Sequence, residues 1–393
     1  MTTLQFAAIC ATIPYYHTVN RIRKWGRLPS RRGPTIVLAN HQGDLDSPVI
    51  VMRLIAERPL REPVLSVAGR RMFEPGFMVK DSPPWLHPFL RRVDASPLFA
   101  AIGLQPMENE LGSRALSSYA WIVRERHGDM PIEQAFEDSA LAKSGLHGIR
   151  LSDVLSPQHF AAGKTYVKTR EVREPYRSEI ARQTRDRVEA DLASVEDLVR
   201  RGATFHLTPE GRFSRDGKLY RFRATFWRLA PIAAIYLSPI AFDPFRSKRP
   251  QMLIRILGPV EAAQARLQLA AARPVVVSQL LAEYLTAHAS FSRDDVAHAI
   301  VARVRSLPKT LFVDPDLARD PERLVDQSLR ELLRLRILVR DGENYRLGPA
   351  RTAPSFPLAD DIVAYQAAFF AETLEADAAL RALAAPPPLV GGG

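Results

Sequence analysis

The sequence contains a single cysteine, Cys10, among its 393 residues. One cysteine cannot form an intramolecular disulfide bond, and it cannot supply a cysteine-rich zinc site. We therefore expect a protein of a reducing compartment. Cys10 lies far along the chain from the polar motifs described below, so we interpret it as a buried apolar residue rather than as a nucleophile.

Long apolar runs are also missing. A transmembrane helix requires about eighteen or more apolar residues, and no segment offers them without interruption. The most apolar stretch near the start, 6–16, is broken by Thr12 and Pro14. The N-terminus likewise lacks the charged start, long apolar run and cleavage site of a secretory signal. The sequence therefore predicts a protein that is soluble or peripherally attached to a membrane.

Acidic residues are absent from the first forty positions, although the formal net charge of the chain is +11. Part of this excess reflects an arginine-rich composition, with 46 arginines and eight lysines. Basic residues interleaved with an aromatic ring suit an anionic lipid surface. We therefore predict that residues 1–32 form a basic arm on such a membrane, with a solvated arm as the alternative. The residues concerned are Arg21, Arg23, Lys24, Trp25, Arg27, Arg31 and Arg32.

Short apolar segments alternate with helical patterns along much of the chain. This alternation is typical of an α/β fold, with a mostly parallel sheet flanked by helices. Helices are predicted at 47–58 and 187–202, the second ending before Gly202. Strands are predicted at 35–39, 63–69, 100–107, 203–207, 235–242 and 252–260.

The composition changes along the chain and indicates four parts. A basic arm, 1–32, precedes an α/β domain, 33–265, which carries a polar insertion or lid at 109–180. A smaller helical domain follows at 266–350. Its helix at 325–338 and its hairpin at 339–348, on an Asp-Gly turn, are typical of a winged-helix module. The last part, 351–393, contains a helix at 358–384 and a tail, 385–393, that we expect to be disordered.

The first polar motif, Asn40-His41 followed by Asp46, comes directly after the strand predicted at 35–39. Residues five apart lie ~140° apart around a regular helix, so His41 and Asp46 meet only if His41 lies in the turn. Asp46 can then accept from one imidazole nitrogen and leave the other free to take a proton from a hydroxyl. The alternative is that Asp46 simply caps a helix and His41 is a polar turn residue.

The second polar motif follows the strand predicted at 203–207. Between 212 and 223 it carries five basic residues and one acidic residue, Asp216. Glycines together with Arg, Ser and Lys suit a phosphate, which requires forked donors, a point charge and close backbone approach. A charged surface loop is the alternative. The candidate residues are Glu210, Gly211, Arg212, Ser214, Arg215, Gly217 and Lys218.

Together the two motifs resemble the glycerolipid acyltransferase superfamily, which has an Asn-His-x-x-x-x-Asp motif and a later Pro-Glu-Gly motif. The loop at 210–218 is most similar to the glycerol-3-phosphate acyltransferase version. The resemblance covers about 30–110 and 185–262 of the chain. Two positions depart from the family pattern, because Glu108 and Phe213 stand where the family has arginine. Arg114 is the candidate replacement for the first of these arginines.

The resemblance implies a role for each matched residue. His41 is the general base that deprotonates the acceptor hydroxyl, and Asp46 orients its ring. Glu210 orders the loop, and it belongs with Gly211 to the substrate-binding residues. The acceptor phosphate is bound by the remaining loop residues, which are Arg212, Ser214, Arg215 and Lys218.

The resemblance also implies the reaction and its setting. A fatty acyl group moves from acyl-CoA or acyl carrier protein to glycerol 3-phosphate in phospholipid biosynthesis, with no metal ion and no bound cofactor. The protein is expected in the cytoplasm, peripheral on the inner face of the cell membrane, with no nucleic-acid partner. The alternatives are a lysophospholipid (1-acylglycerol-3-phosphate) acyltransferase and a catalytically silent lipid- or nucleic-acid-binding protein.

Overall fold

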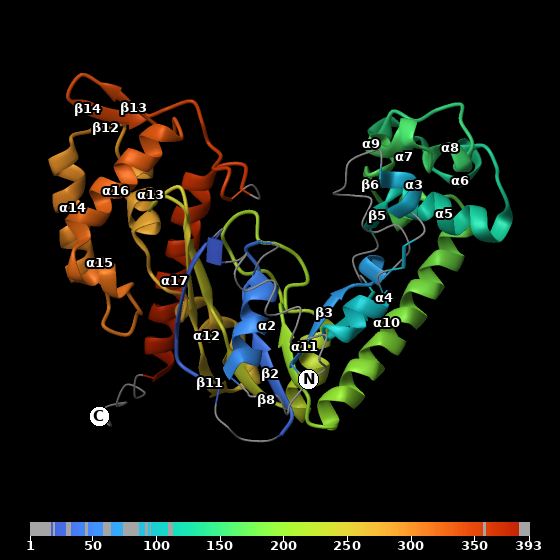
Figure 1. Ribbon diagram of the computed structural model, residues 1–393, viewed down its shortest axis with the longest axis horizontal. Helices are drawn as coiled ribbons and strands as arrows, with labels where there is room; N and C mark the ends of the chain where they lie inside the picture. The colour runs from blue at the N-terminus through green and yellow to red at the C-terminus, as the bar shows by residue number, and fades with distance from the viewer. Residues whose placement is uncertain are drawn as a thin grey trace, which may run out of the picture. The chain divides into compact units, whose positions relative to one another are not determined.

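A computed structural model describes ten ranges of the chain: 17–18, 20–28, 33–43, 46–57, 64–73, 86–90, 93–94, 96–108, 113–356 and 359–384. The chain divides into two compact units. Unit 1 comprises Met1–Ser66 and Leu198–Gly393, and unit 2 comprises Val67–Asp197. The described residues form a mixed α/β fold with parallel strands, as the sequence predicts (Figure 1).

The main sheet of unit 1 positions both polar motifs. Five of its six strands follow the order β11-β8-β2-β7-β3. They are β2 (Thr35–Leu38), β3 (Val64–Gly69), β7 (Thr204–Leu207), β8 (Ala234–Leu237) and β11 (Leu257–Val260). β2 runs parallel to both β7 and β8 and is completely buried, as expected for an apolar strand covered on both faces. Parallel strands end at one edge of a sheet, so the segments that follow β2 and β7 lie together.

A smaller sheet in unit 1 has the order β1-β10-β9, with β1 (Arg21–Trp25), β9 (Ile240–Asp243) and β10 (Gln251–Arg255). The prediction of one continuous strand at 235–242 and another at 252–260 is therefore wrong. Each segment breaks in the middle and supplies one strand to each sheet. Pro239 has no N–H to donate to a ladder, and both backbone groups of Ile240 bond to the side chain of Asn40 instead.

The basic arm predicted at 1–32 is only partly within the described residues, and the described part is not a solvated arm. Arg21–Trp25 forms β1, which pairs in parallel with β10. Arg23 forms ion pairs with Asp314 at 2.9 Å and with Asp316 at 2.8 Å. Its charge is therefore compensated within unit 1. Cys10, Arg31 and Arg32 lie outside the described residues.

The C-terminal half of unit 1 is mainly helical and shares one hydrophobic core with the main sheet. The hairpin predicted on the Asp-Gly turn is confirmed, because β13 pairs with β14 from Leu338 to Leu347. Residues 266–350 were expected as a separate domain, but they belong to the same compact unit as β2. The helix predicted at 358–384 begins at Ile362, and the tail 385–393 lies outside the described residues.

Further α-helices and strands of unit 1 are α2 (Asp46–Glu57), α11 (Ala224–Leu229), α12 (Ala265–Ala271), α13 (Val277–Ala287), β12 (Ser290–Phe291), α14 (Arg293–Ser306), α15 (Pro315–Arg319), α16 (Pro321–Arg334), β13 (Leu338–Asp341), β14 (Asn344–Leu347) and α17 (Ile362–Ala384). Figure 1 shows α13, α14 and α16 gathered beside the short strands β12, β13 and β14. The long helix α17 packs against α12 and α13. This packing brings α17 into the same core as the strands that carry the polar motifs.

Unit 2 has its own hydrophobic core, built around Tyr119, Phe136 and Leu151. The segment predicted as a polar insertion at 109–180 is therefore a packed helical module. The compact unit that contains it covers a longer range of the sequence, Val67–Asp197. A short sheet pairs β5 (Ser113–Ala115) with β6 (Tyr166–Lys168). The α-helices of its described residues are α3 (His87–Leu90), α4 (Ser96–Ala101), α5 (Leu116–His127), α6 (Ile132–Ala135), α7 (Asp138–Ser144), α8 (Leu151–Val154), α9 (Phe160–Gly163) and α10 (Tyr176–Arg200).

Two boundaries near unit 2 differ from the predicted ones. The strand predicted at 100–107 begins only at Leu104, as β4 (Leu104–Met107), because α4 occupies the residues up to Ala101 and Gly103 has a φ of 88°. The helix predicted at 187–202 starts earlier, at Tyr176, and is followed by Gly202 with a φ of 92°. None of the helices in the described ranges is long and apolar enough to cross a bilayer.

Candidate active site

His41 lies in the turn between β2 and α2, and the backbone of this turn is held at several points. The N–H of Ala39 donates to the carbonyl of Leu207 at 3.0 Å, which continues the contact between β2 and β7. The side chain of Asn40 accepts from the N–H of Ile240 at 2.8 Å and donates to its carbonyl at 3.0 Å. Asn40 is therefore a positioning residue that fixes the start of the turn.

The structure brings His41 and Asp46 together. Nδ1 of His41 lies 3.4 Å from Oδ2 of Asp46. The Asp46 side chain is completely buried, whereas that of His41 is 17% exposed. Within the described ranges, Nε2 of His41 has no hydrogen-bond partner. Nε2 is therefore the ring nitrogen left for a bound molecule.

The same carboxylate organises the His41 turn. The N–H groups of Gln42 and Gly43 both donate to Oδ2 of Asp46, the latter at 2.8 Å. A helix cap accepts from N–H groups two or three residues later in the chain, whereas these donors precede Asp46. Burial raises the pKa of Asp46, while the His41 ring and the two N–H groups favour its ionised form. The simple helix-cap alternative therefore does not describe the observed contacts.

Glu210 connects the second motif to His41. Its Oε1 accepts from the N–H of His41 at 3.3 Å, and its Oε2 accepts from the N–H of Tyr220 at 2.8 Å. The N–H of Ser214 donates in turn to the carbonyl of His41 at 2.9 Å. Burial raises the pKa of Glu210 to about 7, although these hydrogen bonds oppose the shift. Both backbone groups of His41 are thus bonded to the loop that follows β7.

The loop presents its cations to solvent. Arg212, Arg215 and Lys218 are all exposed, and no carboxylate in the described ranges forms an ion pair with them. The guanidinium of Arg212 lies 3.7 Å from the centre of the Tyr220 ring. Phe213, which stands where the resembled family has arginine, packs against His41 with ring centres 4.1 Å apart. An apolar ring therefore borders the candidate base, and it belongs to a loop that also exposes three cations.

Ser214 and Gly217 contribute to the structure of the loop rather than facing a ligand. The hydroxyl of Ser214 is buried and donates to the carbonyl of Lys218 at 3.0 Å, so it is not directed to a ligand as the sequence predicted. Gly217 has a φ of 81° and lies so close to α17 that a Cβ there would be 2.3 Å from the carbonyl oxygen of Tyr365. Gly211 is exposed and also has a positive φ of 65°.

Residues of α17 and the segment after α12 support the loop, and the motifs did not indicate them. Glu372 accepts from the N–H of Leu219 at 2.7 Å and pairs with the buried Arg273 at 2.8 Å. The hydroxyl of Tyr365 accepts from Nε2 of Gln42 at 3.2 Å. The sequence feature that could have indicated these residues is the set of polar side chains on the buried face of α17, an otherwise apolar helix.

A second histidine on β7 differs from His41 in its surroundings. His206 is completely buried, and its Nδ1 lies 3.2 Å from the hydroxyl of Ser66. Burial lowers the pKa of His206 to about 3, and the charge of a protonated His41 adds to this effect. His206 therefore stays neutral at physiological pH, whereas His41 is the partly exposed imidazole of this site.

The predicted replacement arginine has a partner in unit 2. Arg114 forms an ion pair with Glu108 at 2.7 Å, so the two residues of unit 2 that bear on the family pattern contact each other. Across the described ranges, no group of three or more His, Cys, Asp or Glu side chains is arranged to hold a metal ion. Comparisons with models of known protein families and with curated proteins found no match for this chain.

Proposed function

We propose that this protein transfers a fatty acyl group from a thioester, acyl-CoA or acyl carrier protein, to a hydroxyl of glycerol 3-phosphate. The observation that carries the proposal is the His41–Asp46 contact, which holds Nδ1 against a buried carboxylate on a side chain that is itself partly exposed. A histidine held in this way is suited to accept a proton from a hydroxyl.

In the proposed reaction, the acceptor hydroxyl gives its proton to Nε2 of His41 while its oxygen attacks the thioester carbonyl carbon. The tetrahedral intermediate then collapses, the C–S bond breaks, and the departing thiolate takes the proton back from His41. Asp46 stabilises the imidazolium between these two steps, because its carboxylate lies against Nδ1. The acyl group is never bonded to the protein.

The acceptor phosphate is assigned to Arg215 and Lys218, with Arg212 beside them. These side chains are exposed, and they project from the loop that Glu210 and Ser214 hold against the His41 backbone. Forked guanidinium donors and an ammonium group suit a phosphate. A phosphate bound here keeps the neighbouring hydroxyl close to His41, which lowers the entropic part of the barrier.

A second acceptor class, 1-acylglycerol 3-phosphate, is favoured by one contact. Phe213 packs against the His41 ring with a centroid distance of 4.1 Å and places an apolar surface beside the base. Such a surface suits an acceptor that already carries an acyl chain.

We place this reaction in phospholipid biosynthesis, at the inner face of the cell membrane, with the protein bound there peripherally. The support is the net charge of +11, since basic proteins are attracted to anionic leaflets. An acceptor or product that partitions into the bilayer would bring the enzyme to the same surface.

The direct test incubates the purified protein with a long-chain acyl-CoA and follows the release of free thiol. We expect release that requires glycerol 3-phosphate or 1-acylglycerol 3-phosphate and that is not supported by glycerol, which lacks the phosphate. Thiol release that is independent of any acceptor would instead indicate a thioester hydrolase. No release with either phosphorylated acceptor would contradict the proposal.

A further inference from the structure

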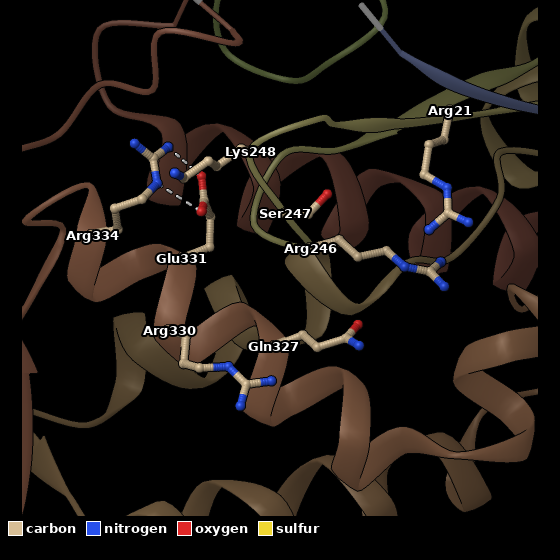
Figure 2. Close-up of a pocket in the computed structure, with 8 residues that line it drawn as sticks. All are labelled: Arg21, Arg246, Ser247, Lys248, Gln327, Arg330, Glu331 and Arg334. Atoms are coloured by element: carbon tan, nitrogen blue, oxygen red, sulfur yellow. Dashed lines mark hydrogen bonds and ion pairs between the residues drawn. The ribbon is translucent and has the colours of Figure 1, made fainter. Parts of the chain in front are cut away.

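A second concentration of positive charge lies in unit 1, in a cavity of about 420 Å³ (Figure 2). Its side chains come from three segments that are distant in sequence. Arg21 belongs to β1, residues 246–248 follow β9, and the others project from α16, which contributes Gln327, Arg330, Glu331 and Arg334. The cavity is therefore formed by the edge of the smaller sheet and one face of a helix.

Strand register separates this cavity from the candidate active site. Ile240, at the start of β9, bonds to Asn40 beside His41. Arg21 pairs with Gln251, which pairs with Asp243 at the other end of β9. Three residue steps at ~3.3 Å each place roughly 10 Å of strand between the two ends. The cavity is thus a different site from the loop that follows β7.

Two cations of the cavity are already compensated. Arg246 is buried and forms ion pairs with Asp314 at 3.0 Å and with Asp316 at 2.6 Å. Arg334 pairs with Glu331 on the preceding turn of α16, with Nε 2.9 Å from the carboxylate. These pairs fix the shape of the wall and add little net charge.

The other three cations, Arg21, Lys248 and Arg330, are exposed, and no carboxylate in the described parts of the chain forms an ion pair with them. Asp326 lies one turn before Arg330 on α16, but its two oxygens each accept from Arg293 at 2.8 Å. Like charges that line one cavity repel each other, and a bound anion relieves this repulsion.

We propose that this cavity binds the phosphate group of a ligand. Two guanidinium forks and one ammonium suit a tetrahedral dianion, and the Gln327 amide offers further donors at the same wall. The volume falls within the range of small-molecule sites, roughly 300–1,000 Å³, so the phosphate can carry an organic group. That phosphate belongs either to an anionic lipid headgroup or to a soluble phosphorylated compound. The proposal does not depend on acyl transfer.

Binding of inorganic phosphate tests the proposal by isothermal titration calorimetry at low ionic strength. The full chain with Arg215→Gln and Lys218→Gln is the background, because it removes the candidate phosphate site of the loop. Adding Arg21→Gln, Lys248→Gln and Arg330→Gln is expected to weaken phosphate binding by about a hundredfold or more. The matched control, Arg305→Gln, Lys309→Gln and Arg340→Gln, removes the same charges from exposed positions outside the cavity and should bind like the background.

Equal binding by the cavity variant and the control, or no binding by the background at millimolar phosphate, would overturn the proposal. Sedimentation with phosphatidylcholine vesicles, with and without phosphatidic acid, distinguishes the two sources of phosphate. A cavity variant that also loses phosphatidic-acid-dependent sedimentation identifies a lipid headgroup. One that loses only inorganic phosphate identifies a soluble compound. With the loop intact, the cavity variant keeps wild-type acyl transfer to a soluble acceptor, so this test is independent of the proposed function.

Discussion

Asp46 makes two kinds of contact, and single substitutions separate them. Its Oδ2 accepts from backbone N–H groups of the turn and also faces the His41 ring. Asp46→Asn keeps an oxygen for the backbone but removes the charge that stabilises the imidazolium. We expect kcat to fall by ~10²-fold or more with little change in thermal stability. Asp46→Ala also leaves the N–H groups unpaired, so its free energy of unfolding should fall by about 1–3 kcal/mol. A fully active Asn variant would reduce Asp46 to a structural residue.

Glu210 predicts a pH dependence of stability. Its pKa in the folded protein is about 7, above the ordinary value of 4.5, so the folded state keeps a proton that the unfolded chain has lost. The resulting stabilisation is complete below about pH 4.5 and is lost as the pH rises through 7, with a total of about 3 kcal/mol. Glu210→Gln does not titrate. Urea unfolding should therefore show wild type losing stability relative to this variant between pH 4.5 and 8, and a constant difference would contradict the assignment.

At the level of elements, we propose that the loop after β7 carries the acceptor specificity. Each charge-assisted hydrogen bond contributes roughly 1.5–3 kcal/mol. Arg215→Gln and Lys218→Gln should each raise the KM for the phosphorylated acceptor about tenfold to a hundredfold and leave the KM for the acyl donor nearly unchanged. Arg305→Gln, an exposed charge on α14, is the matched control. Steady-state kinetics with both substrates measures the two KM values. An unchanged KM for the acceptor in these variants would indicate an uncharged acceptor.

Substitutions at two glycines with similar backbone conformations test whether the packing of this loop against α17 stabilises the protein. Gly342, in the β13–β14 turn, has a φ of 63° and open space around it, so Gly342→Ala costs only the left-handed strain of about 1–2 kcal/mol. Gly217→Ala meets the Tyr365 carbonyl as well and should cost a further ~1–3 kcal/mol. Urea unfolding measures both variants. An equal loss of stability would show that the loop does not depend on α17.

Some of these elements could be predicted from the sequence and others could not. The strands at 35–38 and 204–207, each followed by its polar motif, and the Asp-Gly hairpin were predictable from local pattern. The breaks at Pro239 and Ile256 were not, because a strand that passes from one sheet to another remains apolar throughout. The support from Glu372 and Tyr365 is more than 140 residues away in sequence and depends on how α17 packs, which no local signal contains.

For the molecule as a whole, net charge is less informative than the distribution of compensated charge. Arg23 lies in the segment expected to bind membranes as a free arm, yet it is paired with Asp314 and Asp316. Burial lowers the pKa of the neighbouring Lys24 to about 8. The uncompensated cations of unit 1 instead include the loop after β7 and the cavity beside α16. We therefore expect these two places to attract anionic partners.

The central claim, that His41 is the base of an acyl transfer, is tested most directly by mass spectrometry of reaction products. Wild type and His41→Ala are each given acyl-CoA with a panel of glycerol phosphates and lysophospholipids. We expect an acylated, phosphate-bearing product from wild type and a rate lower by ~10²–10⁴-fold from the variant, with the same circular dichroism spectrum because His41 lies in a partly exposed turn. Product from the variant at the wild-type rate, or no acylated product from wild type, would contradict the account.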